Sequence, residues 1–334
     1  MMQDTVARRL SPQLCHRVRG EDTFPVEWRP LDGGDGFAVR AAWPTDHPFF
    51  TPVRRGEERC HDPLLIVETL RQASMALLHS VHGLPLNRHI LLSEIYLTCD
   101  PTGLSVAGDE PGIEIRFAET VVRGTQLAEM LVEWTVRRGT RVVATGGGHA
   151  RFAGGAAYRR LRGGHVEAGV VHPGPFARRA PAPLAGRTRR EDVLLAPTGR
   201  EGVWELIVDT GHPTLFPRPN DHIPGMLFLE AARQAVSAAV WPRPCLPTGL
   251  RIRFDRYAEF DGGPCLLRAE PRGPAESAGA AGTSAGAAGA SAGAAGASAG
   301  AAGASAGAAD VPGTFEVTGY QDGARLFSCE LRTG

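Results

Sequence analysis

Hydrophobic and polar residues follow the same succession of patterns in both halves of the chain. Apolar and polar residues alternate at 37–43 and again at 203–208, as they do in a half-buried β-strand. A long segment without turn residues follows each strand, at 63–79 and at 224–240, and it is apolar on nearly all sides. A helix of that kind is buried inside a domain. The pattern therefore predicts one strand and one buried helix in each half.

Further strand-like segments follow each predicted helix. Four apolar runs separated by Gly, Pro and Asp come after the first helix, at 90–99, 112–122, 127–137 and 141–152. Four more come after the second helix, at 249–257, 264–270, 314–319 and 324–331. Short connections between strands are typical of antiparallel sheets. The whole pattern predicts an α+β double hotdog, in which two tandem curved antiparallel sheets each wrap one long central helix.

A repeated motif supports this duplication. Each copy consists of His-Pro, a loop, four apolar residues, Glu, two further residues and Arg-Gln-Ala. The first copy extends from His47 to Ala73, and the second extends from His212 to Ala235. Two copies separated by about half the chain indicate two domains of one fold.

The duplication also predicts the domain boundaries. We expect an N-terminal hotdog domain at 1–153, a linker at 154–187 and a C-terminal hotdog domain at 188–334. Within the second domain, residues 277–309 repeat Ser-Ala-Gly-Ala-Ala-Gly-Ala every seven residues. Frequent Gly and the lack of large apolar side chains predict a disordered insertion there. The two domains would form an internal pseudo-dimer within a monomeric chain.

The predicted helices carry charged residues inside their apolar sequences. Glu68 and Arg71 lie three positions apart on the first helix, so they share one face. Glu230 and Arg233 repeat the pair on the second helix. A buried charge is costly unless it is paired or used, so each pair is either an intrahelical salt bridge or part of a functional site. The repetition favours the functional interpretation, with Glu230 as a base whose pKa is raised by burial.

Three histidines and the start of the second helix are further candidates. His47 and His212 occupy equivalent positions ahead of the two helices, and His222 lies close to the second helix. Each is a candidate acid–base group, although a lone His is more often structural. The backbone N–H groups of Gly225 and Met226 lack helical partners and could hold an oxyanion. The first helix lacks this Gly, so we expect the second helix to carry the dominant site.

Composition excludes several classes of function. The chain has 334 residues, with 36 basic and 36 acidic side chains, and this balance argues against a nucleic-acid or anionic-membrane surface. All 36 basic residues are Arg, which excludes Schiff-base chemistry on Lys. Six Cys occur without zinc spacing, and no apolar run is long enough to span a membrane. We expect a reduced, cytoplasmic protein that needs no resident metal and no cofactor.

Three segments, 47–53, 62–72 and 212–235, resemble the two repeat signatures of the A-factor biosynthesis (AfsA) family. The resemblance implies synthesis of γ-butyrolactone autoregulators in actinobacteria. The implied reaction transfers a 3-oxoacyl group from acyl carrier protein to the hydroxyl of dihydroxyacetone phosphate. The candidate catalytic residues are then Glu230, His47, Glu68, His212 and His222. The candidate substrate-binding residues are Arg233 and Arg71 for the phosphate, and Gly225 and Met226 for the thioester oxygen.

Two other classes of protein remain open. Another hotdog enzyme, either a 3-hydroxyacyl dehydratase or a thioesterase, would use the same His and Glu residues on an acyl thioester. The start of the second helix is similar to the Pro-Gly-Val-Leu stretch of 3-hydroxyacyl-carrier-protein dehydratases. A non-catalytic acyl-binding protein would keep a pocket but would not need Arg on a buried helix.

Overall fold

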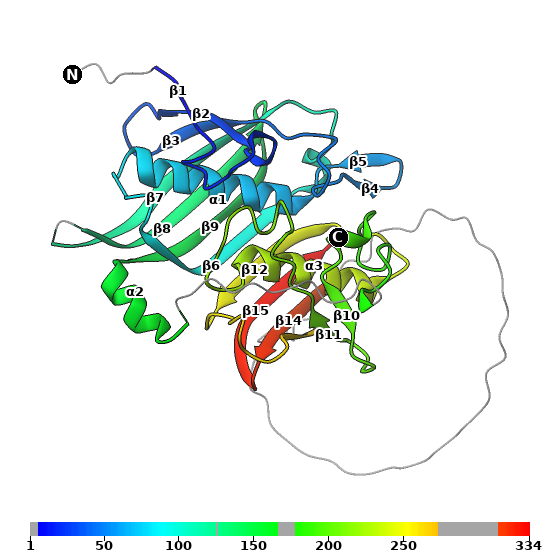
Figure 1. Cartoon of the computed structure of the whole chain (residues 1–334). Helices are drawn as coiled ribbons and strands as arrows, with labels where there is room; N and C mark the ends of the chain where they lie inside the picture. Colours follow the sequence, from blue (N-terminus) through cyan, green and yellow to red (C-terminus); the bar gives the residue numbers. More distant parts are fainter. Residues whose placement is uncertain (1–5, 125, 166–177, 273–312) are drawn as a thin grey trace, which may run out of the picture.

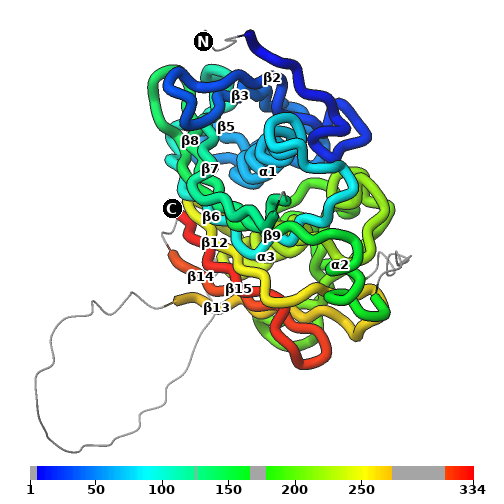
Figure 2. Tube along the Cα trace, turned by 90° about the vertical axis from the view of Figure 1, so that its left-hand side faces the viewer, coloured from blue at the N-terminus to red at the C-terminus, as the bar shows by residue number. Residues whose placement is uncertain are grey.

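The computed structural model describes residues 6–124, 126–165, 178–272 and 313–334, so the predicted insertion at 277–309 lies outside the described residues. Thirteen strands of the described chain form one continuous sheet. The two long helices, α1 (Pro63–Ser80) and α3 (Gly225–Val240), lie on the same side of this sheet (Figure 1 and Figure 2). Strands β4 (Val53–Arg55) and β5 (Glu58–Cys60) form a separate hairpin.

The sheet has the same strand order in both directions from its centre, where β6 (His89–Cys99) pairs with β12 (Pro247–Phe254). Outward from β6 follow β9 (Arg141–Ala153), β8 (Gln126–Arg138), β7 (Pro111–Arg123), β3 (Phe37–Ala41), β2 (Pro25–Pro30) and β1 (Arg8–Arg9). Outward from β12 follow β15 (Ala324–Thr333), β14 (Gly313–Gln321), β13 (Leu266–Arg272), β11 (Val203–Leu206) and β10 (Leu195–Pro197). The neighbouring strands are antiparallel, and an approximate twofold axis passes between β6 and β12. The predicted double hotdog is confirmed.

The helices begin where the sequence predicts. At the start of α1, the Asp62 carboxylate accepts a hydrogen bond from the backbone N–H of Leu64 (2.9 Å), and Pro63 fits the first turn because it has no N–H to satisfy. Helix α3 begins after Pro224, which provides no side-chain cap. Side chains of both helices belong to one apolar core that extends through both halves. Burial of apolar side chains is therefore the main force that joins the halves.

The main strands that follow each helix are also confirmed, whereas several short elements were missed. Strands β1, β2 and β10 and helix α2 (Gly155–Arg162) had no strong periodic signal. Helix α2 lies in the segment predicted as a linker, where it buries Tyr158 and Arg162. No helix of the described chain is both long enough and apolar enough to cross a membrane.

The sequence predicts a β-bulge at Gly146–Gly147–Gly148, and the structure shows that this prediction is wrong. The register of β9 with both neighbouring strands is unbroken through these three residues. A Cβ atom on Gly147 would lie 2.3 Å from the Tyr96 hydroxyl oxygen and 2.6 Å from the Val132 carbonyl oxygen. Glycine is needed here because side chains from the neighbouring strand cross directly over the backbone.

We predict that Gly147→Ala destabilises the sheet. The added methyl group must displace both Tyr96 and the backbone of β8, so the free energy of unfolding should fall by about 1–3 kcal/mol. Gly112→Ala is the matched control, because Gly112 also lies in a strand and its Cβ would meet no atom within 4 Å. Urea unfolding of both variants checks the prediction. Equal free energies for the two variants would contradict it.

Candidate active site

Each long helix carries a buried carboxylate that is held by two guanidinium groups. In the first half, Glu68 accepts hydrogen bonds from Arg71 (2.8 and 2.9 Å), from the Gln72 amide (2.7 Å) and from Arg17. Arg17 comes from the segment before β2, whereas Glu68, Arg71 and Gln72 share one face of α1. We call these four residues the first network.

The second half repeats the arrangement. Glu230 accepts hydrogen bonds from Arg187 (2.8 Å), from Arg233 (2.8 and 3.0 Å) and from the Gln234 amide (2.6 Å). We call these four residues the second network. Its charged groups are buried: Glu230 is 1% exposed and Arg233 is 2% exposed.

Both buried carboxylates are stabilised as anions. Burial alone would raise the pKa of Glu230, but the charges and hydrogen bonds of Arg187 and Arg233 lower it to about 2. The pKa of Glu68 is also lowered to about 2, because Arg17 and Arg71 outweigh the effect of burial. The raised pKa expected for Glu230 is therefore wrong. A carboxylate with such a pKa and with both oxygens occupied is a poor general base.

The motif histidines hold the loops that precede the helices. His47 Nε2 lies 3.1 Å from the Asp22 carboxylate, and its Nδ1 accepts two backbone N–H groups of the following loop. His212 makes the same contacts with Asp192 and with its own loop. All four histidine nitrogens are therefore occupied, and both rings are buried.

The two halves meet through these loops. Arg17 donates a hydrogen bond to the backbone carbonyl of Thr214 (2.8 Å), which lies in the loop of the second motif. Arg187 donates a hydrogen bond to the carbonyl of Phe49 (2.6 Å), which lies in the loop of the first motif. An arginine from each network therefore reaches the backbone of the other half's loop.

Sequence reasoning missed Arg17, Asp22, Arg187 and Asp192. A signal was present, because Arg-x-Arg-x-Glu-Asp occurs at 17–22 and again at 187–192. Each copy ends in a short 3-10 helix, η1 (Gly20–Asp22) or η4 (Arg190–Asp192). A search for repeats upstream of the histidine motifs would have found both copies.

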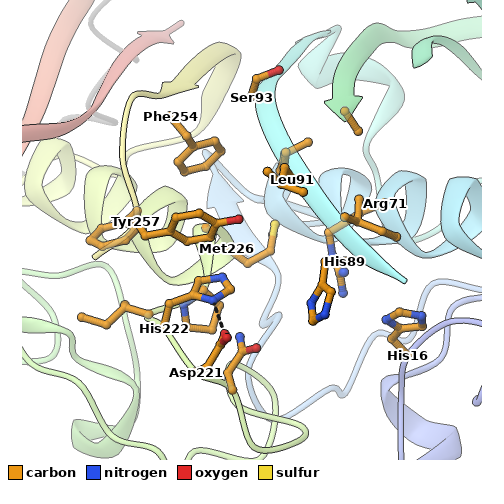
Figure 3. A pocket seen from close by; sticks show the side chains of 18 of the residues that line it. His16, Arg71, His89, Leu91, Ser93, Asp221, His222, Met226, Phe254 and Tyr257 are labelled. Carbon is orange, nitrogen blue, oxygen red and sulfur yellow. Dashed lines mark hydrogen bonds and ion pairs between the residues drawn. The ribbon is translucent and has the colours of Figure 1, made fainter. Parts of the chain in front are cut away.

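One large cavity, of about 1170 Å³, lies between α1, the centre of the sheet and the loop that leads into α3 (Figure 3). The predicted residues that line it are Arg71, His222, Gly225 and Met226. The predicted residues that do not line it are His47, His212, Glu68, Glu230 and Arg233. The cavity thus combines an arginine of the first helix with the N-terminus of the second.

A histidine–carboxylate pair lies on the wall of this cavity. His222 Nδ1 is 2.7 Å from Asp221, and the Tyr158 hydroxyl donates a hydrogen bond to the same carboxylate (2.8 Å) (Figure 3). Burial alone would raise the pKa of Asp221, but hydrogen bonds from His222 and Tyr158 lower it. Within the described part of the chain, no hydrogen bond engages Nε2 of His222. This geometry suits proton transfer at Nε2, with Asp221 orienting the ring.

Most of the remaining cavity wall is apolar and lacks a cysteine nucleophile. Side chains from α1 and the sheet form this wall: Met75, Leu78, Leu91, Phe117, Met130, Phe152 and Phe254. None of the six cysteines lines the cavity, and burial raises the pKa of Cys99 and Cys329 to about 12. Thiolates are therefore disfavoured at these two positions.

Ser93 belongs to a hydrogen-bonded series on the sheet. Its hydroxyl lies 2.6 Å from His149 Nδ1, and His149 Nε2 lies 2.6 Å from Glu129. The Ser93 hydroxyl points away from the other labelled side chains (Figure 3), and neither His149 nor Glu129 lines the cavity. Ser93 itself lines the cavity, so this series places a hydroxyl, but neither of its acid–base groups, at the cavity wall.

One cluster of the described residues has the composition of a metal site. His165, Glu259 and Asp261 lie close enough together to hold an ion. Arg162 already forms an ion pair with Glu259, and His165 contacts Asp261 (3.0 Å). The guanidinium supplies the positive charge that a cation would otherwise provide, so we assign no metal there.

Two half-sheets that each wrap one long helix, with a cavity between the halves, define a double hotdog protein. A family model described as the A-factor biosynthesis hotdog domain (AfsA) matches residues 2–154 and 170–255. The chain belongs to this A-factor biosynthesis family.

The curated relatives share one name. A Streptomyces griseus protein called 2-oxo-3-(phosphooxy)propyl 3-oxoalkanoate synthase is 49% identical over 77% of this chain and 84% of its own length. The Streptomyces coelicolor protein of that name is 48% identical over 95% of this chain and 89% of its own length. Among solved structures, the chain is similar to the 12:0-ACP thioesterase from Umbellularia californica, with 9% identity, a TM-score of 0.45, and 84% and 94% of the two chains covered.

The networks predict how stability depends on pH. The pKa of Glu230 and that of Glu68 are about 2 in the folded protein, below the value of about 4.3 for Glu in an unfolded chain. Their contribution is therefore complete above about pH 4.3 and is lost as the pH falls towards 2. The free energy of unfolding should decrease over this range, as measured by urea denaturation.

Glu230→Gln is the variant that tests this prediction. It leaves two buried guanidinium groups with less compensation, so it should lower the free energy of unfolding at pH 7 by about 3–5 kcal/mol. Its stability should also change less between pH 5 and pH 3 than that of the wild type. An unchanged pH dependence would show that Glu230 is not an anion in the folded protein.

Proposed function

We propose that the protein is an acyltransferase of γ-butyrolactone biosynthesis. It transfers a 3-oxoacyl group from the thioester of an acyl carrier protein to the hydroxyl of dihydroxyacetone phosphate. The observation that carries the proposal is one cavity with an apolar wall, an oriented histidine and arginine side chains. The shared name of the relatives supports it, because that name describes a phosphorylated 3-oxoalkanoate ester.

The proposed mechanism is direct transfer. Nε2 of His222 removes the proton of the acceptor hydroxyl, and the Asp221 carboxylate stabilises the imidazolium that forms. The hydroxyl oxygen attacks the thioester carbonyl carbon, and the resulting oxyanion accepts hydrogen bonds from the N–H groups of Gly225 and Met226. The carbon–sulfur bond then breaks, and His222 returns its proton to the departing thiolate. The products are the ester and the free thiol of the carrier.

The other proposed roles follow from position. The acyl chain lies along the apolar wall between α1 and the sheet, where burial of its methylene groups stabilises the complex. Arg71 offers its guanidinium to the phosphate of the acceptor. The residues that do not line the cavity, which are His47, His212, Glu68, Glu230 and Arg233, hold the loops and helices that shape it.

Incubation of the pure protein with a 3-oxoacyl thioester distinguishes the candidate functions. An acyltransferase forms the phosphorylated ester, identified by mass, only when dihydroxyacetone phosphate is present. A thioesterase releases the free acid without the acceptor, and an acyl-binding protein consumes no thioester. We expect ester formation that depends on the acceptor. Equal thioester loss with and without acceptor would overturn the proposed function.

We predict that His222→Gln lowers kcat for acyl transfer by about 100-fold or more, because it removes the base. Asp221→Asn should lower kcat less, because the ring remains but loses its charged partner. His149→Gln is the matched control, because His149 does not line the cavity, and it should stay close to wild type. Melting temperatures of the three variants exclude a loss of fold. Near-normal turnover by His222→Gln would assign the base to another residue.

A further inference from the structure

The two networks differ in their balance of charge. In the second network, Arg187 lies 3.5 Å from Asp62, the residue that caps α1 of the other half. The twofold relation matches Asp62 with Pro224, which occupies the same position at the start of α3 and carries no charge. Arg17, the equivalent of Arg187, therefore has no such carboxylate at the start of α3.

This single difference leaves the first network with excess positive charge. In the second network, Arg187 and Arg233 face two carboxylates, Glu230 and Asp62. In the first, Arg17 and Arg71 share Glu68 alone. Asp22 and Asp192 occupy equivalent positions, and each pairs with its own histidine; Asp22 also interacts electrostatically with Arg17. The Nε–H of Arg17 is buried and lacks a hydrogen-bond partner in the described chain.

A third guanidinium adds to the imbalance. Arg218 lines the cavity together with Arg17 and Arg71. Burial and repulsion by Arg71 and Arg17 lower the pKa of Arg218, and no carboxylate among the described residues contributes to raising it. These three arginines and Glu68 together carry a net charge of two positive units.

The first network also borders the cavity through Arg17 and Arg71, whereas no residue of the second network lines it. Gly186, beside Arg187, has a φ of +61°, and a Cβ there would lie 2.8 Å from Ser237 and 3.0 Å from Arg233. The residue beside Arg17 is His16, which has a φ of 54°, a conformation that non-glycine residues rarely adopt. The His16 ring lines the cavity and contacts His79 (2.8 Å). Strained backbone of this kind concentrates at functional sites.

We propose that Arg17, Arg71 and Arg218 form a subsite for a phosphate monoester dianion. This inference rests on the proposed function and identifies where the phosphate of the acceptor binds. A phosphate monoester carries nearly two negative charges at pH 7 and presents three acceptor oxygens. It therefore supplies the charge that Asp62 supplies in the second network, and its second negative charge balances Arg218. Guanidinium groups fit phosphate because their planar donors can bind two oxygens at once.

Pro224→Asp tests the charge balance directly, because it places a carboxylate where the second network has one. Asp is also a good helix cap, so the melting temperature should be unchanged or higher. Inorganic phosphate should raise the melting temperature of the wild type above that in chloride of equal ionic strength, and this increase should vanish in Pro224→Asp. Pro224→Asn is the matched control: it caps the helix without charge and should keep the increase. An equal response of both variants to phosphate would overturn the inference.

Arg218→Gln tests the contribution of the loop arginine during turnover. It should raise KM for dihydroxyacetone phosphate by about tenfold or more, as expected for a lost charge-assisted hydrogen bond, with little change in kcat. Arg218→Lys should recover part of the loss, and KM for the thioester should not change. With dihydroxyacetone, which has no phosphate, wild type and Arg218→Gln should be equally active. An equal loss with both acceptors would show that Arg218 does not bind phosphate.

The two assays separate this inference from the proposed function. Protection by phosphate does not require turnover, so protection without ester formation would overturn the proposed function alone. Ester formation that is unaffected by Pro224→Asp and Arg218→Gln would overturn the subsite alone.

Discussion

A carboxylate buried inside a helix requires compensation, and this requirement determines how each half of the protein is assembled. Glu68 and Glu230 are stable as anions only because arginines from distant segments reach them. Arg17 and Arg187 come from irregular segments ahead of β2 and β10, and each also donates a hydrogen bond to a carbonyl in the other half. One ion network therefore fixes a helix, an N-terminal segment and a loop across the pseudo-twofold axis. Apolar burial joins the halves, and the networks define how they are aligned.

The same arrangement gives two different sites from two similar halves. The second network is closed because its charges balance and because Gly186 allows Arg233 to pack tightly. The first is open to the cavity, where His16 replaces the glycine and Pro224 replaces the capping carboxylate. Differences at a few positions thus leave one ion network enclosed and bring arginines of the other to the cavity wall.

The sequence was informative where structure follows periodicity, and less so elsewhere. The long helices and central strands were predictable because apolar spacing and the repeated motif both describe local geometry. Arg17 and Arg187 were not predicted, because they lie in irregular segments and their partners are distant in sequence. The sequence indicates that Glu230 is buried, because its helix is apolar, but it predicts the wrong direction for the pKa. The arginines that lower this pKa against the effect of burial are brought to Glu230 only by the folding of the chain. The sequence pointed to His222 but not to Asp221, because adjacency along the chain does not show that the Asp221 carboxylate contacts the imidazole ring.

Both halves belong to one polypeptide, and the pairing of β6 with β12 joins their strands into one sheet. In a dimer of identical chains, every substitution appears twice, so losing the capping carboxylate would unbalance both ion networks together. In a tandem chain, each copy can change alone, and one network can keep the fold intact while the other is altered for a ligand. A tandem chain is therefore free of the symmetry constraint that a homodimer imposes on its two sites.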